Sequence, residues 1–272
     1  MKSAHEDLDE IRGEPSGTLA VGAGNTIGMY LLPQILGEFR RANSLVRISL
    51  RIGTVNELLQ ALARKEIDVA LVEQEVPAVR QKDLNQTAYG EDELVLIVPP
   101  DHPWASAVSI TPSDILKTPL LVRHPDSRTR QLIFKHLGEA GVDTASLDIF
   151  LEVGNTEALK RMVMAGLGVA FVSRFAIEHE VSNRALKVVP IEGISIKRKL
   201  WLLTPPSESL PERLKRFSAF ITGHPPKLSA LFTAMALALG GTPPEILPSE
   251  QGNAATGPDR HERIHEKWRK TV

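Results

Sequence analysis

The feature that most constrains this chain is a repeated alternation of two kinds of segment. Short runs rich in Val, Ile and Leu are typical of buried parallel strands, and segments with an apolar residue every three or four positions are typical of one-sided helices. The first cycle predicts a strand at 18–23, a helix with Leu32 and Phe39 on its apolar face, and a strand from Val46. The chain is therefore predicted to be an α/β protein.

Further cycles follow along the chain. The capping-box pattern at 54–57 predicts a helix start, and an apolar run from Asp68 predicts the next strand. After Pro99 and Pro100 the alternation begins again, which predicts a second domain. Its expected strands are 119–124, 149–153, 168–173 and 186–191, with helices at 128–137 and 155–165. An extended run at 197–206 and a closing helix marked by Leu210, Leu214, Phe217 and Ile221 complete the pattern.

Length, charge and composition exclude several classes of function. The 272 residues suffice for two compact units. Lys and Arg number 32 against 33 Asp and Glu, so the chain lacks the positive field that non-specific nucleic-acid binding needs. The absence of cysteine excludes disulfides, thiolate metal sites, iron–sulfur clusters and a cysteine nucleophile.

The most apolar run and the first residues bear on location. Residues 228–239 form an apolar run of 12 residues, whereas a membrane-spanning helix needs about 20. The charged start carries no apolar stretch typical of a secretory signal. We therefore expect a cytoplasmic protein that does not cross a membrane.

Small polar residues gather where predicted strands end. Ligands of open α/β sheets bind outside the carboxyl ends of the strands, so we expect two facing domains to enclose a polar cleft. Helix capping alone accounts for any single one of these residues, but the joint pattern indicates a binding site. The candidates are Asn25, Thr26, Thr54, Asn56, Ser127, Thr129, Asn155, Thr156 and Ser173.

A basic cluster adds a second indication. Arg123, His124, Arg128 and Arg130 are opposed only by Asp126, which would give the cleft a positive potential. A solvated charged loop explains the same residues equally well. In the first interpretation, His124 and Arg128 contact the ligand, and His124 makes that contact sensitive to pH.

Two further motifs resemble known sites only superficially. The run GAGNTIG at 22–28 has the spacing GxGxxxG, and no acidic residue ends the second strand, so a dinucleotide site is not favoured. It predicts a tight turn whose first helical amides, beside Asn25 and Thr26, attract anions. HERIH at 261–265 matches the metalloprotease pattern HExxH but lies in a polar tail without an apolar helix face.

Several longer segments resemble the effector-binding domain of LysR-type transcriptional regulators. The resemblance covers about residues 15–224. The segments that carry it are GTLAVGAG from Gly17, YLLPQILGEFRRAN from Tyr30, VRISLRIGTVNELLQALARKEIDVALV from Val46, ELVLIVPPDHPWA from Glu93 and EVGNTEALKRMVMAGLGVAFVSRFAI from Glu152.

The resemblance implies a type 2 periplasmic-binding-protein-like fold, in which two Rossmann-like subdomains are joined by two crossover strands. Residues 15–98 and 205–224 would form subdomain I, and residues 99–204 would form subdomain II. The family also implies a homodimer or higher oligomer, with the helix 31–41 contributing to the pairing. It implies a small effector in the cleft, contacted by Thr26, Thr54, Ser127, Thr129, Asn155 and Thr156.

The chain departs from the family at both ends. Family members begin with a winged helix-turn-helix, whereas residues 1–14 resemble only the end of the linker helix that follows it. DNA would be bound only through that missing region, and the sequence is either a piece of a longer reading frame or a regulator fragment. The tail 225–272 extends past the usual family ending and is predicted to be largely disordered.

The sequence thus predicts a non-enzymatic sensor domain that binds a small, anionic metabolite without a cofactor. Helix amino termini at Thr26, Thr54 and Asn155 would hold the anion. A solute-binding protein of a transport system shares the expected fold and is the alternative. A remote alternative is a metallohydrolase that uses His261, Glu262 and His265.

Overall fold

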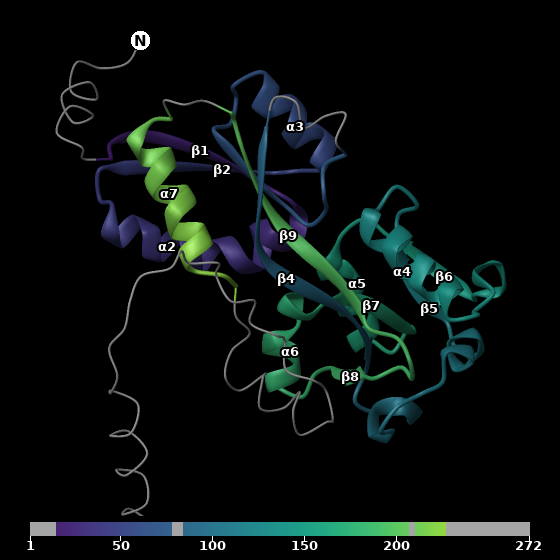
Figure 1. The fold of residues 1–272 in the computed structure, drawn as a ribbon. Helices are drawn as coiled ribbons and strands as arrows, with labels where there is room; N and C mark the ends of the chain where they lie inside the picture. Colours follow the sequence, from purple (N-terminus) through teal and green to yellow (C-terminus); the bar gives the residue numbers. More distant parts are fainter. Residues whose placement is uncertain (1–14, 78–83, 207–209, 227–272) are drawn as a thin grey trace, which may run out of the picture. The chain divides into compact units, whose positions relative to one another are not determined.

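The computed structural model describes residues 15–77, 84–206 and 210–226 (Figure 1). The predicted linker segment 1–14, nearly all of the tail 225–272 and the HERIH motif lie outside the described residues. The described residues all belong to the unit Met1–Gly241. Within the described ranges, none of the helices combines the length and apolar character that a bilayer span requires.

The strands form one mixed sheet in the order β2-β1-β3-β9-β4-β7-β5-β6, and β8 pairs with β4. β1 pairs in parallel with β2 and β3, and β5 pairs in parallel with β6 and β7. The long strands β4 and β9 run antiparallel to each other between these two parallel groups (Figure 1). The strands are β1 Gly17–Ala23, β2 Val46–Ile52, β3 Val69–Val72, β4 Asn85–Val98, β5 Leu120–Arg123, β6 Ile149–Val153, β7 Val169–Ser173, β8 Lys187–Val189 and β9 Ile196–Thr204.

The longer helices lie where the apolar period predicts them. The predicted capping box closes around Thr54 and Glu57 at the start of α3, and Pro33 lies in the first turn of α2. The short helix α6 was not predicted, because five residues cannot display a helical period. The helices are η1 Ile27–Leu31, α2 Leu32–Ala42, α3 Val55–Ala63, α4 Arg128–Glu139, α5 Thr156–Met164, α6 Glu178–Ser182 and α7 Glu212–Gly223; short 3₁₀ turns are η3 Pro103–Ser106, η4 Pro112–Lys117, η5 Thr144–Ser146 and η6 Arg174–Ala176.

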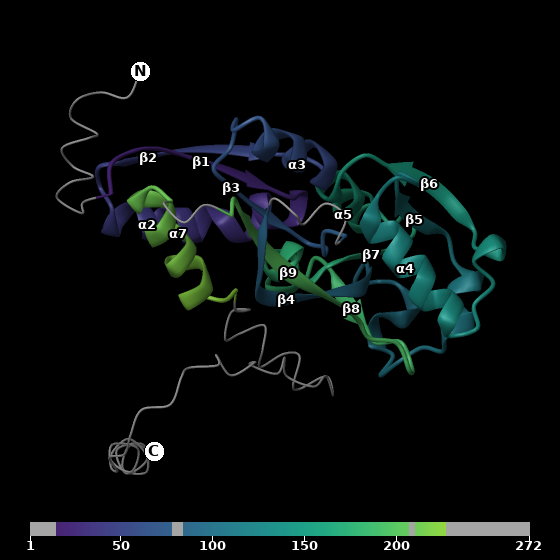
Figure 2. The same cartoon turned by 45° about the horizontal axis from the view of Figure 1, so that its top comes forward.

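The first parallel group is covered on both faces. Phe39 of α2 and Phe217 of α7 meet edge to face with ring centroids 5.1 Å apart, over a core that includes Leu19 and Leu71. Figure 2 shows α2 and α7 lying together on this side of the strands. Leu58 of α3 packs in a separate core on the other face. We call this part, with β1, β2, β3, η1, α2, α3 and α7, lobe I.

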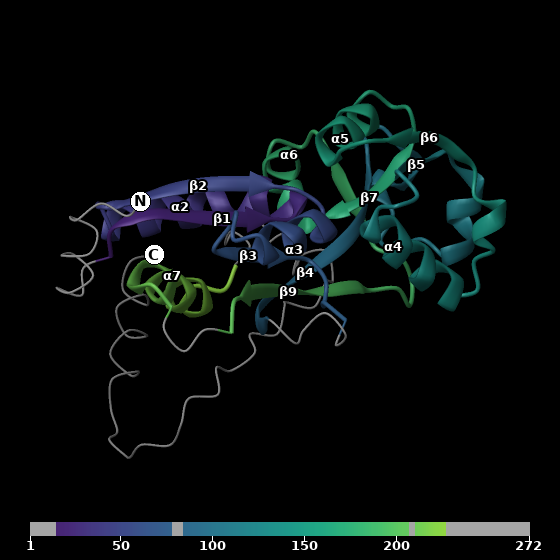
Figure 3. The same ribbon diagram turned by 90° about the horizontal axis from the view of Figure 1, so that it is seen from above.

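The second parallel group is covered in the same way. α4 shares one core with Leu94 and Leu96 of β4, whereas α5 shares another core with Val95 and Ile97. Because successive side chains of a strand point to opposite faces, the two helices cover opposite faces of the sheet, as Figure 3 shows. We call this part, with β5, β6, β7, β8, α4, α5 and α6, lobe II.

β4 and β9 join the two lobes and contribute to both cores. Tyr89 and Leu200 are buried in the core of lobe I, and Leu94 and Ile196 are buried in that of lobe II. This architecture agrees with the α/β fold and the two crossover strands that the sequence predicts. The subdomain boundaries at 98/99 and 204/205 stay predictions, because the two strands belong to both cores.

The junction between β5 and β7 depends on a glycine. Gly168 has a φ of +153°, and a Cβ there would overlap the carbonyl oxygen of Pro119, which accepts the amide hydrogen of Val169 at 3.0 Å. Gly168→Ala should therefore lower the free energy of unfolding by more than about 1 kcal/mol, as measured by urea denaturation. The control is Gly138→Ala in α4, where a Cβ has no neighbour within 4 Å; unfolding at wild-type stability for Gly168→Ala would contradict the prediction.

Candidate functional site

A buried ion pair joins the two crossover strands. Asp92 of β4 and Arg198 of β9 are direct partners in the antiparallel register. The Asp92 Oδ2 atom lies 2.8 Å from Nε and 2.6 Å from Nη2 of Arg198, and the two side chains are 0% and 8% exposed. Removing two charges from water is unfavourable unless their remaining hydrogen-bonding atoms find partners, so the surroundings of the pair decide its stability.

Those partners come from both lobes. Arg198 Nη2 donates to the Thr26 hydroxyl in lobe I at 3.0 Å, and Nη1 donates to the Thr129 hydroxyl in lobe II at 3.1 Å. The Ser173 hydroxyl donates to Asp92 Oδ1 at 2.8 Å and accepts the Phe175 amide hydrogen. Three predicted site residues therefore meet at one ion pair that the sequence analysis did not identify.

The turn after β1 already holds a carboxylate. Glu73 Oε1 accepts the amide hydrogens of Thr26 and Ile27 at 2.9 and 3.2 Å. A Cβ at Gly24 would overlap the Glu73 carboxylate, so only glycine allows this approach. The predicted attraction of an anion to this turn is physically correct, but a side chain of the protein occupies the amides that the prediction assigned to the ligand.

Arg123, at the end of β5, lies beside the start of α5. Its Nη1 donates to the Thr156 hydroxyl at 3.1 Å, and its Nη2 donates to the Gly154 carbonyl at 2.9 Å. Its Nε is buried without a hydrogen-bond partner, and no carboxylate of the described residues forms an ion pair with it. Burial lowers the pKa of Arg123, while the charges of Tyr30 and Glu73 act to raise it. Arg123 is thus a partly desolvated cation bonded to neutral acceptors.

A second contact between the lobes lies at Tyr30. Its hydroxyl donates to Glu157 Oε1 at 2.6 Å, and the Lys160 ammonium lies 5.1 Å from the centre of its ring. Lys160 is 3% exposed and also contacts Glu157, Glu180 and the Ala176 carbonyl. Burial acts to raise the pKa of Glu157, but hydrogen bonds from Lys160 and Tyr30 outweigh it and hold the pKa below its usual value.

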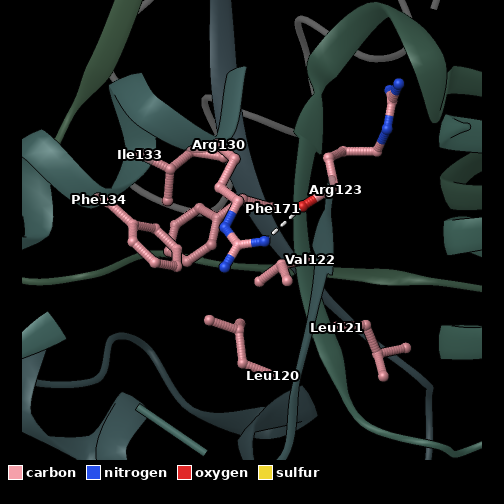
Figure 4. A pocket seen from close by; sticks show the side chains of 8 residues that line it. All are labelled: Leu120, Leu121, Val122, Arg123, Arg130, Ile133, Phe134 and Phe171. Carbon is pink, nitrogen blue, oxygen red and sulfur yellow. Dashed lines mark hydrogen bonds between the residues drawn. The ribbon is translucent and has the colours of Figure 1, made fainter. Parts of the chain in front are cut away.

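A small pocket with about 10 Å³ of free volume is lined by β5, α4 and Phe171 of β7. Figure 4 shows Arg130 reaching across it to the Arg123 carbonyl, while the Arg123 side chain points to the other side of β5. Arg130 also pairs with Glu152 at 2.6 Å and stacks near Phe134. Because Arg130 is bonded within lobe II, it does not belong to the group around Asp92 and Arg198.

Three predicted site residues cap helices. Thr54 accepts the Glu57 amide hydrogen, while the Glu57 carboxylate accepts from the Thr54 amide, which lowers the pKa of Glu57. Ser127 accepts from the Arg130 amide at the start of α4, and Asn155 accepts from the Ala158 amide at the start of α5. Capping therefore explains the local geometry of all three, and their part in ligand binding stays a prediction.

The other predicted residues lie on the surface. Asn25 and Asn56 are exposed, and Arg128 bonds Gln131 on the outside of α4. His124 faces Asp126 at 3.4 Å, with both side chains largely in solvent. Contacts of these four with a ligand stay predictions.

The residues that sequence reasoning missed are charged groups of the crossover strands and the β3 end. Asp92 stands in the sequence GEDEL and Arg198 in KRKL, so neighbouring charges hide which one faces inward. The only available signal for Glu73 was its place directly after the apolar run of β3. In the described part of the chain, no cluster of three or more His, Asp or Glu is placed to hold a metal ion.

Two lobes around a polar centre on antiparallel crossover strands define a ligand-binding domain of the α/β class. The model of the LysR substrate binding domain family matches residues 12–225. The chain belongs to this family.

Curated relatives agree with this assignment. A probable RuBisCO transcriptional regulator of Synechocystis sp. is 38% identical over 226 residues, which are 83% of this chain and 64% of that protein. A protein of the same name from Emiliania huxleyi is 37% identical over 77% of this chain and 67% of its own length. The chain thus spans about two thirds of the length of these relatives.

Solved structures confirm the predicted periplasmic-binding-protein-like fold. The regulatory domain of Synechocystis CcmR in complex with 2-PG has a TM-score of 0.69 at 24% identity, covering 79% of this chain and all of that one. The effector-binding domain of QuiR in complex with shikimate has a TM-score of 0.65 at 19% identity, covering 77% and 97%.

The Tyr30 contact gives a test of how the lobes are held. Tyr30→Phe removes the hydroxyl that donates to Glu157 and should lower the free energy of unfolding by about 1 kcal/mol in chemical denaturation. Tyr89→Phe is the matched control, because the Tyr89 hydroxyl is buried without a partner and its removal should cost nothing. Equal losses in both variants would contradict a stabilising role for the Tyr30 hydroxyl.

Proposed function

We propose that this chain is the effector-binding part of a transcriptional regulator and senses a small anionic metabolite between its lobes. The observation that carries the proposal is Arg123. A desolvated guanidinium without a carboxylate partner is unfavourable, and a bound anion would supply the missing counter-charge. Thr156, which Arg123 already orients, lies at the start of α5, where the helix dipole also favours negative charge.

The neighbouring cations do not compete for this role. Arg198 is paired with Asp92, Arg130 with Glu152, and Lys160 with Glu157 and Glu180. The Glu73 carboxylate already accepts the amide hydrogens of the turn in lobe I. A bound anion could use these amides only by displacing the Glu73 side chain. The charges therefore favour placing the effector's anionic group in lobe II beside Arg123, with polar groups of lobe I facing the rest of the ligand.

The comparisons suggest the first ligand to try. The CcmR regulatory domain was solved with 2-PG, 2-phosphoglycolate, which is a small molecule with a phosphate and a carboxylate. Both groups match a site that offers a guanidinium and hydroxyls. We propose 2-phosphoglycolate or a related organic anion as the effector of this chain.

The rest of the proposal follows from the named relatives. Because they are transcriptional regulators, we propose that DNA is bound through a region outside this chain, that the protein acts as a homodimer or higher oligomer in the cytoplasm, and that it performs no chemical reaction. The transport alternative gains no support, since the curated relatives reported above carry regulator names.

The proposal predicts stabilisation by an anionic ligand. At 100 times its dissociation constant, 2-phosphoglycolate should raise the free energy of unfolding by about 2.7 kcal/mol, visible as a shift of the thermal midpoint. The uncharged sugar glucose at the same concentration and ionic strength is the control. A thermal midpoint that responds to neither 2-phosphoglycolate nor a panel of organic anions would contradict the proposal.

Two substitutions locate the site. Arg123→Gln should weaken binding of 2-phosphoglycolate at least about tenfold in calorimetry, because the charged hydrogen bond is lost. Thr156→Leu should do the same by filling the space beside Arg123. Arg64→Gln is the matched control, since the Arg64 side chain at the end of α3 is 70% exposed and lies outside the candidate set. Wild-type affinity in Arg123→Gln and Thr156→Leu would place the ligand elsewhere.

A further inference from the structure

Three threonine hydroxyls accept hydrogen bonds from two arginines. Arg198 donates to the hydroxyls of Thr26 and Thr129, and Arg123 donates to that of Thr156. A hydroxyl carries one hydrogen to donate and two lone pairs that accept, and a guanidinium donates only. Each threonine therefore acts as an acceptor toward its arginine and keeps its own hydrogen. No described residue accepts the hydrogen of Thr26 or Thr129.

The two hydroxyls around Arg198 come from different lobes. Thr26 precedes η1 of lobe I, and Thr129 lies in the first turn of α4 in lobe II. Both bond the same guanidinium, which is fixed by Asp92 across the crossover strands. Because the guanidinium is planar and rigid, its two Nη atoms hold the two hydroxyls in a defined relation to each other.

We propose that Arg198 is a specificity-determining residue of the effector site and acts through Thr26 and Thr129. By donating to one lone pair of each hydroxyl, it leaves the hydrogen of each hydroxyl available to a ligand atom that accepts. The inference rests on the proposed function and deepens it. It names the recognised chemistry, which is an oxyanion oxygen of a carboxylate or a phosphate.

This assignment differs from the role of Arg123. Arg123 has no carboxylate partner among the described residues and supplies charge, whereas the charge of Arg198 is balanced by Asp92. Arg198 is a positioning residue, because each of its three guanidinium nitrogens already donates within the protein. Ser173 cannot donate a hydrogen bond to a ligand, since its hydrogen is donated to Asp92.

Ser173 also shows what would happen without the arginine. A hydroxyl beside a carboxylate donates to it, as Ser173 does, and can then only accept from a ligand. Arg198 lies between Asp92 and the two threonines and so prevents this arrangement. The hydroxyls of Thr26 and Thr129 therefore each keep a hydrogen that an acceptor on the ligand can take, whereas Ser173 has none left to donate.

The first experiment measures affinity by calorimetry in Arg198→Lys. Lysine keeps the charge beside Asp92, but a single ammonium cannot reproduce the fixed fork that reaches both hydroxyls. We expect binding of 2-phosphoglycolate to weaken at least about tenfold. Glycolate and inorganic phosphate, measured separately, show whether the carboxylate or the phosphate loses affinity. Thr222→Val is the control, because the Thr222 hydroxyl donates within α7.

The second experiment separates positioning from general stability. In the wild-type background, Thr129→Val should weaken 2-phosphoglycolate at least about tenfold, and Thr129→Ser should restore the affinity. In the Arg198→Lys background, Thr129→Val should cost much less, because the hydroxyl is no longer directed. A purely structural role for Arg198 predicts the same loss in both backgrounds.

The outcomes are distinct. Wild-type affinity in folded Arg198→Lys, or equal effects of Thr129→Val in both backgrounds, overturns the inference and leaves the proposed function standing. Wild-type protein that binds none of the probes overturns the proposed function and the inference together. If Arg198→Lys does not fold, the double variant Asp92→Asn, Arg198→Gln is used in its place in both experiments. This double variant removes both buried charges together, so neither charge is left without its partner.

Discussion

The buried pair of Asp92 and Arg198 is the interaction on which the arrangement of this domain depends. Two charges removed from water cost several kcal/mol unless good geometry and further hydrogen bonds compensate them. Here the compensation comes from Thr26, Thr129 and Ser173, which belong to three different elements. The pair is therefore favourable only when the turn after β1, the start of α4 and the end of β7 all lie at the crossover strands. One electrostatic requirement thus fixes the positions of both lobes around the candidate site.

The same site is electrically asymmetric. Lobe I provides Glu73, whose carboxylate takes the amides of Thr26 and Ile27, so the positive end of the first helix is already neutralised. Lobe II provides Arg123, whose hydrogen bonds to the described residues go to a hydroxyl and a carbonyl. General reasoning about helix amino termini places an anion equally at either lobe. The structure breaks this equivalence, because one terminus carries an internal anion and the other carries a desolvated cation.

Local periodicity predicted most of the fold, and long-range pairing explains what it could not predict. Strands such as β6 at Ile149–Val153 and the capping box at Thr54 follow from neighbouring residues alone. The pairing of Asp92 with Arg198 joins positions 106 residues apart and depends on the register of two strands that each carry three charged residues in a row. The same limit applies to Glu73, since its partners Thr26 and Ile27 lie 47 and 46 residues earlier. Sequence patterns therefore singled out the hydroxyls of Thr26, Thr129 and Ser173, but not the charged pair to which these hydroxyls are hydrogen-bonded.

The overlap between lobe contacts and site residues links binding to conformation. A ligand shifts a conformational equilibrium only as far as it binds one arrangement better than another, and a tenfold preference corresponds to about 1.4 kcal/mol. Thr26 and Thr129 both reach Arg198 only when the two lobes are arranged as they are here. A ligand oxygen that receives both hydroxyl hydrogens stabilises this arrangement over any other. A ligand that contacts Arg123 and Thr156 alone touches only lobe II and has no such preference, so an effector must span the crossover strands to act as a signal.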